Sequence, residues 1–254
     1  MTLPAVLITG GAKRLGAAMA QQFAADGWHV VIHYRSSAAD AEALATTLPS
    51  AETVACDLAD DDAAVAMIEE LAARLPNWRA LINSASIFSY DSVTELDPAA
   101  NRQAMQVNAL SPARMTQAYF ANAKAANGRR VIQILDQKLA NPNPDFFSYT
   151  MSKHALAATI PMQAMSPQKA SDRIYGLAPG AILASHDQTE EEAESSHLRN
   201  LLQRRTWPDE VAKAAVFLAS GQLATGETIY VDSGQHLLSQ SRDVIYLERE
   251  GLTA

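Results

Sequence analysis

The sequence has almost no cysteine, no excess of positive charge and no long apolar run. Cys56 is the single cysteine in 254 residues, which excludes an intramolecular disulfide and a cysteine-based metal site, and no other metal site is predicted. The formal net charge of −8 argues against nucleic acid as the main partner. We find no signal-peptide pattern and no membrane-spanning run, so we expect no membrane association and a cytoplasmic location.

Apolar runs and helical patterns alternate along the chain. Hydrophobic residues make up 48% of the sequence, which is enough for a large core. The alternation is typical of a doubly wound parallel sheet flanked by helices, so the predicted fold class is α/β with one domain over residues 1–254. Strands are expected at 4–9, 28–34, 51–58, 80–83, 130–135, 173–178 and about 228–232, and helices at 16–25, 38–48, 60–74, 98–127, 148–166 and 208–219.

A glycine-rich turn follows the first expected strand and opens the first helical pattern. It reads Gly10-Gly11-Ala12-Lys13-Arg14-Leu15-Gly16. In a strand–turn–helix unit of this kind, backbone N–H groups and a helix N-terminus receive a phosphate, and Gly10 and Gly16 allow a ligand to approach the backbone closely. The context favours a dinucleotide site in a Rossmann-like domain over an ordinary turn.

The residues after the second expected strand indicate which dinucleotide binds. Tyr34 is followed by Arg35-Ser36-Ser37, and no carboxylate occurs before Asp40. A basic residue at this place accepts a 2′-phosphate, whereas an acidic one binds the ribose hydroxyl. Arg35 offers a planar fork to phosphate, and Lys13 or Arg14 would add charge. NADPH is therefore favoured over NADH, with a plain polar turn as the alternative.

Tyr149 and Lys153 lie four residues apart at the start of a helical pattern, so they share one helix face. A nearby ammonium favours the phenolate, so we expect Lys153 to lower the pKa of Tyr149 from its usual value of about 10. Asp136 ends the fifth expected strand, and catalytic groups collect at strand ends in α/β proteins. These three residues are candidate catalytic groups, although a solvated helix face would show the same Tyr–Lys spacing.

Five motifs in order give the chain a resemblance to short-chain dehydrogenases/reductases from Leu3 to about Leu238. They are Gly10…Gly16, Asn83-Ser84-Ala85, Asn108, Tyr149…Lys153 and Pro179-Gly180. Within that superfamily the chain resembles the pteridine reductases in TGGAKRLG with Arg14 where most members have Gly, HYRSSA at 33–38, NSASIF at 83–88, and Asp136 where most members have Ser. The resemblance implies a homodimer or homotetramer that pairs through the helices at 98–127 and 148–166.

The resemblance also implies roles for single residues. Asp57 would bond to adenine with help from the backbone of Leu58, although Asp57 would also suit a cap for the helix at 60–74. Asn108 would hold a water against Lys153 as the fourth catalytic residue. The implied cofactor contacts are Gly10, Lys13, Arg14, Leu15, Gly16, Tyr34, Arg35, Ser36, Ser37, Asp57, Leu58, Asn83, Ala85, Ser86, Pro179 and Gly180.

A slot for a flat heterocycle, between the nicotinamide and Phe88, follows from the same resemblance. Arg14 and Ser86 match residues that bond the pterin or the cofactor phosphate. Phe146 stands where protozoan pteridine reductases carry a second active-site Tyr, and is included among the substrate residues with Asp136 and Tyr149. An exposed aromatic such as Phe88 is otherwise often only a lid over the core.

The carboxylate at position 136 bears on the reaction. Unless it were protonated, it would repel the oxyanion of a ketone reduction, but it suits reduction of a C=N bond, whose nitrogen must gain a proton. We therefore expect NADPH-dependent reduction of a small molecule, a pterin such as a dihydropterin, a biopterin-like compound or dihydrofolate, with the proton supplied by Tyr149 and Asp136. A short-chain carbonyl reductase and a non-catalytic cofactor-binding scaffold are the alternatives.

Two segments carry weaker patterns. Residues 181–206 are polar and are expected to form a substrate loop. Within it, Glu190–Glu194 is expected to be a solvated helix face, and His186 and His197 are poor candidates for substrate contact. The tail from about residue 239 would be free to cover a neighbour's active site.

Overall fold

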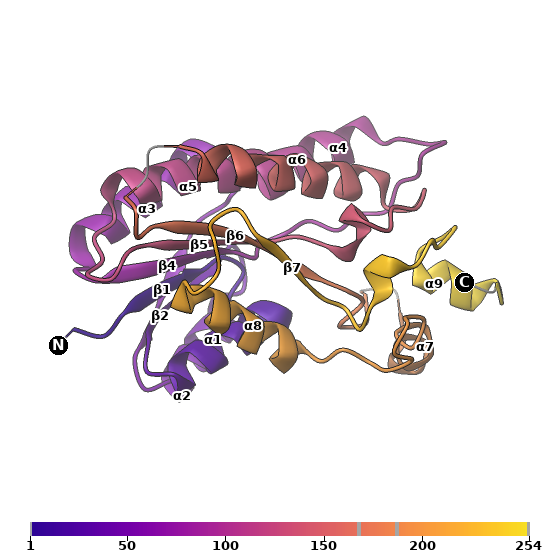
Figure 1. Cartoon of the computed structure of the whole chain (residues 1–254), viewed down its shortest axis with the longest axis horizontal. Coiled ribbons are helices and arrows are strands. Elements are labelled where there is room, and N and C mark those ends of the chain that lie inside the picture. Colours follow the sequence, from indigo (N-terminus) through magenta and orange to yellow (C-terminus); the bar gives the residue numbers. More distant parts are fainter. Residues whose placement is uncertain (1, 167–168, 186–187, 253–254) are drawn as a thin grey trace.

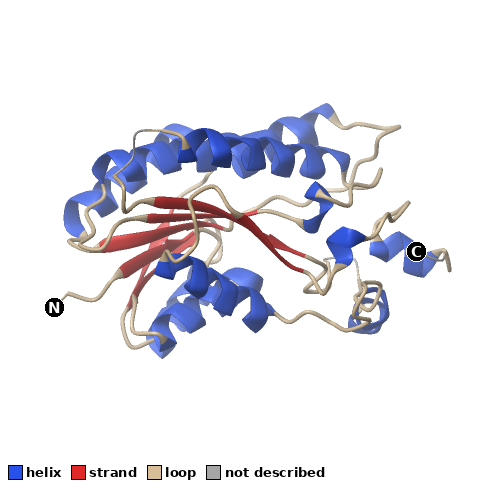
Figure 2. Ribbon diagram, in the orientation of Figure 1, coloured by secondary structure: helices blue, strands red, loops and turns tan. Residues whose placement is uncertain are grey.

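A parallel seven-stranded sheet lies at the centre of the computed structural model, which describes residues 2–166, 169–185 and 188–252 (Figures 1 and 2). The strand order is β3-β2-β1-β4-β5-β6-β7, and each neighbouring pair is parallel. The predicted doubly wound α/β fold is thereby confirmed. The strands are β1 (Ala5–Ile8), β2 (His29–Tyr34), β3 (Ala51–Ala55), β4 (Trp78–Asn83), β5 (Arg130–Ile134), β6 (Arg173–Pro179) and β7 (Thr228–Val231).

The central strands read as unbroken apolar runs because helices cover both faces of the sheet. In β1, all four residues are buried. Successive side chains point to opposite faces, so Leu7 joins one core cluster and Val6 and Ile8 join the other. A strand with one solvated face would instead alternate apolar and polar residues.

The helices form a layer on each face of the sheet (Figure 1). On one face, Leu71 and Tyr119 of the helices pack against Leu7 and Leu81 of the sheet. On the other, Met19 and Phe23 pack against Ile8 and Ile32. The first layer holds α3 (Asp61–Arg74), α4 (Pro98–Met105), α5 (Ser111–Asn122) and α6 (Phe147–Ala164), and the second holds α1 (Arg14–Ala25), α2 (Ala38–Thr47) and α8 (Pro208–Ser220).

The helix expected over 98–127 differs in two respects. It ends at Asn122, and its bend takes the form of a π-helical turn, η1 (Gln106–Leu110), between α4 and α5. Pro112 explains the bend, because it has no N–H to donate and its ring would clash with the carbonyl of Asn108 four residues earlier in a regular α-helix.

The third strand is shorter than expected and ends before Asp57. Asp57 accepts a 3.0 Å hydrogen bond from the backbone N–H of Ala59 within a turn. Asp60 directly precedes α3 and accepts from the N–H of Ala63 at 2.9 Å. The alternative role of Asp57 as the helix cap is therefore wrong, because Asp60 occupies the capping position.

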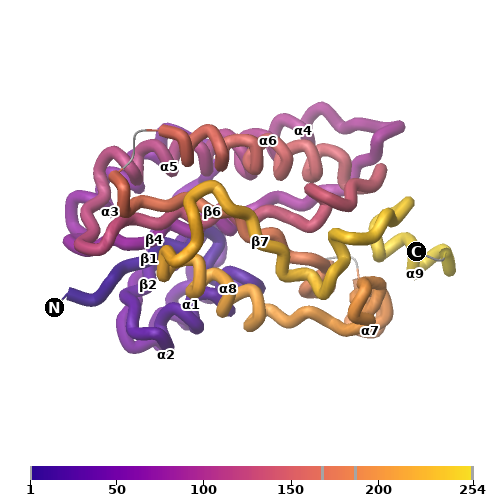
Figure 3. Tube along the Cα trace, in the orientation of Figure 1, coloured from indigo at the N-terminus to yellow at the C-terminus, as the bar shows by residue number. Residues whose placement is uncertain are grey.

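Two short helices lie beyond the carboxyl ends of β6 and β7, α7 (Glu190–Ser196) and α9 (Val244–Arg249) (Figures 1 and 3). The segment expected as a polar loop thus contains a helix, which a capping box of Thr189 and Glu192 starts. The acidic face is only partly solvated, since Glu192 pairs with Arg249 of α9. His186 lies outside the described residues. Single 3₁₀ turns occur at η2 (Gln137–Leu139) and η3 (Gln235–Leu237).

No helix in the described parts of the chain combines the length and apolar character that a bilayer crossing requires.

Candidate active site

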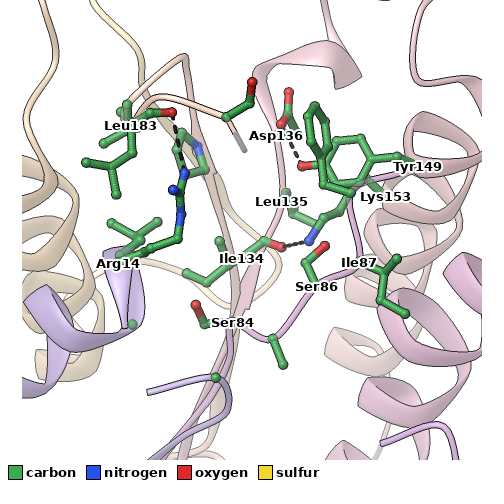
Figure 4. A pocket seen from close by; sticks show the side chains of 18 of the residues that line it. Arg14, Ser84, Ser86, Ile87, Ile134, Leu135, Asp136, Tyr149, Lys153 and Leu183 are labelled. Carbon is green, nitrogen blue, oxygen red and sulfur yellow. Dashed lines mark hydrogen bonds between the residues drawn. The ribbon is translucent and has the colours of Figure 1, made fainter. Parts of the chain in front are cut away.

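The strand order changes direction between β1 and β4, and a parallel sheet opens a crevice at the carboxyl ends of its strands at such a point. A cavity of about 620 Å³ lies there. The segments that follow β1, β2, β4, β5 and β6 line it, and Figure 4 shows part of this lining. The predicted site residues that line the cavity are Gly10, Lys13, Arg14, Leu15, Gly16, Arg35, Asp57, Leu58, Ala85, Ser86, Phe88, Asp136, Tyr149, Lys153, Pro179 and Gly180.

The glycine-rich turn leaves room for a ligand at the start of α1. Gly10 adopts a φ of +63°, and a Cβ added there would lie 3.0 Å from the Cα of Ala85. A Cβ on Gly16 would collide with the carbonyl oxygen of Gly10. No side chain caps α1, and its first turn holds no acidic residue. The first N–H groups of this helix are therefore suited to an anionic ligand.

His33 and Thr9 hold the turn in place, although the sequence did not single out either side chain. His33 Nδ1 accepts from the N–H of Gly10 at 3.1 Å, and its Nε2 lies 3.0 Å from the carbonyl oxygen of Cys56. The ring is therefore protonated on Nε2, and burial lowers the pKa of His33 to about 4. Thr9 Oγ1 accepts from the N–H groups of Ser84 and Ala85 at 2.9 and 3.0 Å. The sequence signal for Thr9 and His33 was that each is a polar residue within an apolar run.

Arg35 provides the exposed cation at the end of β2. It lines the cavity and forms no ion pair within the described residues. Lys13 is instead paired with Asp40 of α2 at 2.9 Å, so part of its charge is offset. Tyr34, Ser36 and Ser37 do not line the cavity, because the chain turns away into α2 directly after Arg35.

Tyr149 and Asp136 are in direct contact (Figure 4). The hydroxyl of Tyr149 donates to Oδ2 of Asp136 at 2.7 Å, and Oδ1 accepts from the backbone N–H of Lys138 at 2.9 Å. Tyr149 comes from the first turn of α6, and Asp136 follows β5. Burial raises the pKa of Asp136, so this carboxyl group holds its proton closer to neutral pH than an exposed one does.

The expected acidification of Tyr149 by Lys153 is wrong for this geometry. Burial raises the pKa of Tyr149 well above its usual value, and the adjacent Asp136 raises it further. The ammonium of Lys153 bonds to the carbonyl oxygen of Ile134 at 2.8 Å and lies 5.6 Å from the centre of the Tyr149 ring. Burial also lowers the pKa of Lys153 to about 8, which weakens its influence as a charge.

Asn108 and Asn83 are buried and do not line the cavity. The amide of Asn108 bonds to both backbone groups of Ile87, at 2.8 and 2.9 Å, and to Ser152 at 3.0 Å. Its side chain therefore holds the segment after β4 instead of facing a ligand. The amide nitrogen of Asn83 donates to Gln133 at 2.9 Å, below the floor of the cavity.

Phe88 lines the cavity with Phe146 behind it. The two rings stack at 4.0 Å between centroids with 20° between their planes, and Phe88 also meets Tyr149 edge-on at 4.7 Å. Phe146 is 2% exposed and does not line the cavity. The prediction that Phe146 faces the substrate is wrong here, because Phe88 covers its ring.

Arg14 ties the glycine-rich turn to the segment after β6. Its φ is 52°, which is a strained conformation for a residue with a side chain. Its guanidinium donates to the carbonyl oxygen of Ala184 at 2.8 Å. It also donates to the carbonyl oxygen of Leu183 at 3.5 Å (Figure 4). Arg14 thereby holds one wall of the cavity close to the turn.

The far end of the cavity contains residues that no motif marked. His197 lines it although the sequence made it a poor candidate, and burial lowers its pKa to about 4. Its Nδ1 is buried with no hydrogen-bond partner within the described residues. Gln188, Asp243, Val244 and Ile245 also line this end. The tail therefore packs against its own chain's cavity.

The chain is similar to several known proteins. The family described as enoyl-(acyl carrier protein) reductase matches residues 10–236. Pteridine reductase 1 of Leishmania tarentolae is 28% identical, over 93% of this chain and 97% of that protein. A polyketide synthase putative ketoacyl reductase 2 for granaticin, from Streptomyces violaceoruber, is 25% identical over 92% and 97%. The crystal structure of FolM alternative dihydrofolate reductase 1 from Brucella canis, complexed with NADP, aligns with a TM-score of 0.86 and 31% identity, over 94% of this chain and 96% of that one.

Proposed function

We propose that this chain, which belongs to the short-chain dehydrogenase/reductase family, reduces a pterin with NADPH. A dihydropterin, a biopterin-like compound and dihydrofolate are the candidate substrates. The observation that carries the proposal is the hydrogen bond from Tyr149 to the partly buried carboxyl group of Asp136 at the cavity wall. The similarity to Pteridine reductase 1 and to the NADP-bound FolM structure supports it.

The residues present fit NADPH. The uncapped N-terminus of α1 beside Gly10 and Gly16 suits a pyrophosphate, and Arg35 suits a 2′-phosphate. Asp57 and Leu58 would receive the adenine, and Lys153 the ribose on the nicotinamide side. When bound, NADPH supplies a hydride to the carbon of the C=N bond.

Residues of the chain would then supply the proton. The nitrogen of a C=N bond must gain a proton as its carbon is reduced, and the hydroxyl of Tyr149 is one donor that faces the cavity. Burial raises the pKa of both Tyr149 and Asp136. When Asp136 is protonated, it would return a proton to the phenolate that Tyr149 leaves, along the same contact with the direction of donation reversed. Phe88 offers an aromatic face to a flat ring, backed by Phe146.

A carbonyl reductase is the second candidate, and the similarity to the putative ketoacyl reductase favours it. The negative charge of an ionised Asp136 would oppose the oxyanion of a ketone reduction. A cofactor-binding scaffold without turnover is the third candidate. The intact arrangement of Asp136, Tyr149 and Lys153 counts against it.

A substrate panel separates these three candidates. The wild-type protein is incubated with NADPH and a dihydropterin, dihydrofolate, a diketone or an acyl ketone, and NADPH oxidation is followed by absorbance. The proposal expects turnover of at least one pterin and none of the ketones. Turnover of ketones with inert pterins would support the carbonyl reductase, and NADPH binding without any turnover would support the scaffold. Crystals soaked with NADPH and methotrexate would test directly whether a pterin ring lies against Phe88.

The proposed function includes the oligomeric state of the protein and its location in the cell. We expect a homodimer or homotetramer that pairs through α4, α5 and α6, in the cytoplasm, with residues 181–206 as the substrate loop. Exposed apolar side chains at the ends and outer faces of these helices support the expected assembly. Leu110 is 47% exposed, Met151 41% and Met162 57%. Light scattering on the purified protein measures the assembly, and a monomer would contradict it. Cell fractionation measures the location.

A further inference from the structure

The end wall of the cavity is built from the C-terminal segment of this same chain. Asp243, Val244 and Ile245 line the cavity, about 100 residues along the chain from the catalytic pair. Ile245 belongs to a small apolar cluster with Phe146 and Tyr149, and is 5% exposed. The side chain of Ile245 is therefore positioned where a substrate that reaches Tyr149 would meet it.

Buried polar contacts hold this segment against the loop that follows β5. Asn141 and Gln240 bond to each other twice, at 2.8 and 2.9 Å, and both are buried. Arg242 Nε lies 2.9 Å from a carboxylate oxygen of Asp145, which is itself 2% exposed. The backbone N–H of Asp243 donates to the same carboxylate at 2.8 Å. Contacts this well buried fix the position of the wall instead of leaving it as a loose end.

The same segment places a charge pair beside the catalytic residues. Lys138 Nζ lies 2.8 Å from a carboxylate oxygen of Asp243, and their side chains are 4% and 11% exposed. Lys138 also donates through its Nζ to Asn143 at 2.7 Å, and through its backbone N–H to Asp136 at 2.9 Å. Since Asp243 offsets the charge of Lys138, this part of the wall presents no net positive charge.

These features determine which substituents of a substrate the wall can accommodate. Two branched apolar side chains, Val244 and Ile245, limit the length of any group that extends from the ring bound at Tyr149. An extended anionic group would need an unpaired cation, preferably a guanidinium, to replace its hydration. Lys138 is paired with Asp243. The guanidinium of Arg14 has no ion-pair partner among the described residues, but backbone carbonyl oxygens of the segment after β6 hold it in place. A short uncharged substituent with hydroxyl groups suits this end of the cavity, where His197 has a buried nitrogen without a partner.

We propose that residues 240–246 form the specificity-determining wall of the substrate compartment. In this role Val244 and Ile245 admit heterocycles with a short uncharged substituent and oppose those with a long anionic one. The inference rests on the proposed pterin reductase activity and names the residues that choose between its substrates.

The test compares the wild-type chain with the double variant Val244→Ala plus Ile245→Ala. The substrates are dihydrobiopterin, which carries a short hydroxylated chain, and dihydrofolate, which carries an aminobenzoyl glutamate. We expect the wild type to favour dihydrobiopterin in kcat/KM. We expect the double variant to shift the ratio toward dihydrofolate by about tenfold or more, chiefly through a lower KM, because several methyl and methylene groups leave the wall.

A binding measurement accompanies the kinetics. Calorimetry in the presence of NADP⁺ gives the dissociation constants of biopterin and folate, which need no turnover, and NADPH affinity is measured by fluorescence. Leu252→Ala is the matched control, because Leu252 lies on the same tail, is 40% exposed and does not line the cavity. Circular dichroism establishes that each variant is folded.

Every outcome of these measurements either supports or overturns the proposed role of residues 240–246. A changed substrate ratio and folate affinity in the double variant, with unchanged NADPH affinity and an unaffected Leu252→Ala variant, supports the inference. A folded double variant with the wild-type ratio overturns it, as does an equal loss toward both substrates. If the wild type neither binds nor reduces either compound, the proposed function fails and the inference fails with it.

Discussion

The hydroxyl of Tyr149 donates a 2.7 Å hydrogen bond to Oδ2 of Asp136, and Tyr149 is buried whereas Asp136 is partly buried. A serine hydroxyl in the place of Asp136 both donates and accepts, whereas a carboxylate only accepts until it is protonated. The raised pKa of Asp136 makes the protonated form accessible nearer to neutral pH. Tyr149 and Asp136 together are therefore better suited to donating a proton than to stabilising a developing oxyanion.

Replacement of this carboxyl group tests its part in catalysis. Asp136→Asn keeps a hydrogen-bond acceptor for Tyr149 but has no proton to supply, so we expect kcat for a dihydropterin to fall about 10²- to 10⁴-fold. Wild-type kcat should decline as pH rises through the raised pKa of Asp136, and this limb should be absent in the variant. Steady-state kinetics between pH 5 and pH 9, at roughly constant ionic strength, measure both effects. A wild-type kcat in the variant would leave Asp136 without a role in proton transfer.

Arg35 is expected to determine the preference for NADPH. Arg35→Ala removes the exposed cation after β2, and a lost hydrogen-bonded contact to a charged group costs about 1.5–3 kcal/mol. The KM for NADPH should therefore rise roughly 10- to 100-fold, while the KM for NADH stays the same. Arg102→Ala is the control, since Arg102 is an exposed residue of α4 that does not line the cavity. An equal change toward both cofactors would contradict this role.

His33 should make the protein less stable in mild acid. Its pKa is about 4 in the folded chain, below the ordinary value of 6.5, so between these values the unfolded chain binds a proton that the folded chain does not. Stability contributed by neutral His33 is thus fully present above pH 6.5 and decreases as pH falls toward 4, by about 3 kcal/mol at most.

The variant His33→Gln isolates this contribution. Gln keeps an acceptor and a donor but does not titrate. Urea denaturation at several pH values should show a smaller decrease in unfolding free energy between neutral and mildly acidic pH for the variant than for the wild type. His197, whose pKa is also lowered to about 4, remains in both proteins, so the difference reports His33 alone. Identical pH dependence in the two proteins would count against the assignment.

A buried ion pair stabilises the end of the sheet opposite the cavity. Arg129 and Asp172 lie 2.6 Å apart with side chains 7% and 1% exposed. Asp172→Ala leaves the guanidinium buried without its carboxylate, so we expect a loss of about 3–5 kcal/mol in unfolding free energy. Asp209→Ala breaks the solvent-exposed pair with Lys213 and should lower the unfolding free energy far less. Denaturant unfolding measures both, and unchanged KM values are expected because neither pair lines the cavity.

The sequence by itself determined the sheet, the order of its helices and the glycine-rich turn. These features follow from local rules, since a buried strand such as β1 must be apolar on both faces and the turn leaves little or no space for a Cβ at Gly10 and Gly16. The spacing of Tyr149 and Lys153 belongs to the same class, because four residues on a helix make one turn.

Only the tertiary structure decided the protonation of Tyr149, the roles of His33 and His197, and the origin of the end wall. The pKa of Tyr149 depends on burial and on Asp136, and both come from packing between elements. Ile245 reaches the cavity because the tail bonds to a loop about 100 residues earlier in the chain. The sequence pattern of neither segment indicates this contact. The contact depends on how two distant surfaces fit together and not on the backbone conformation of either segment.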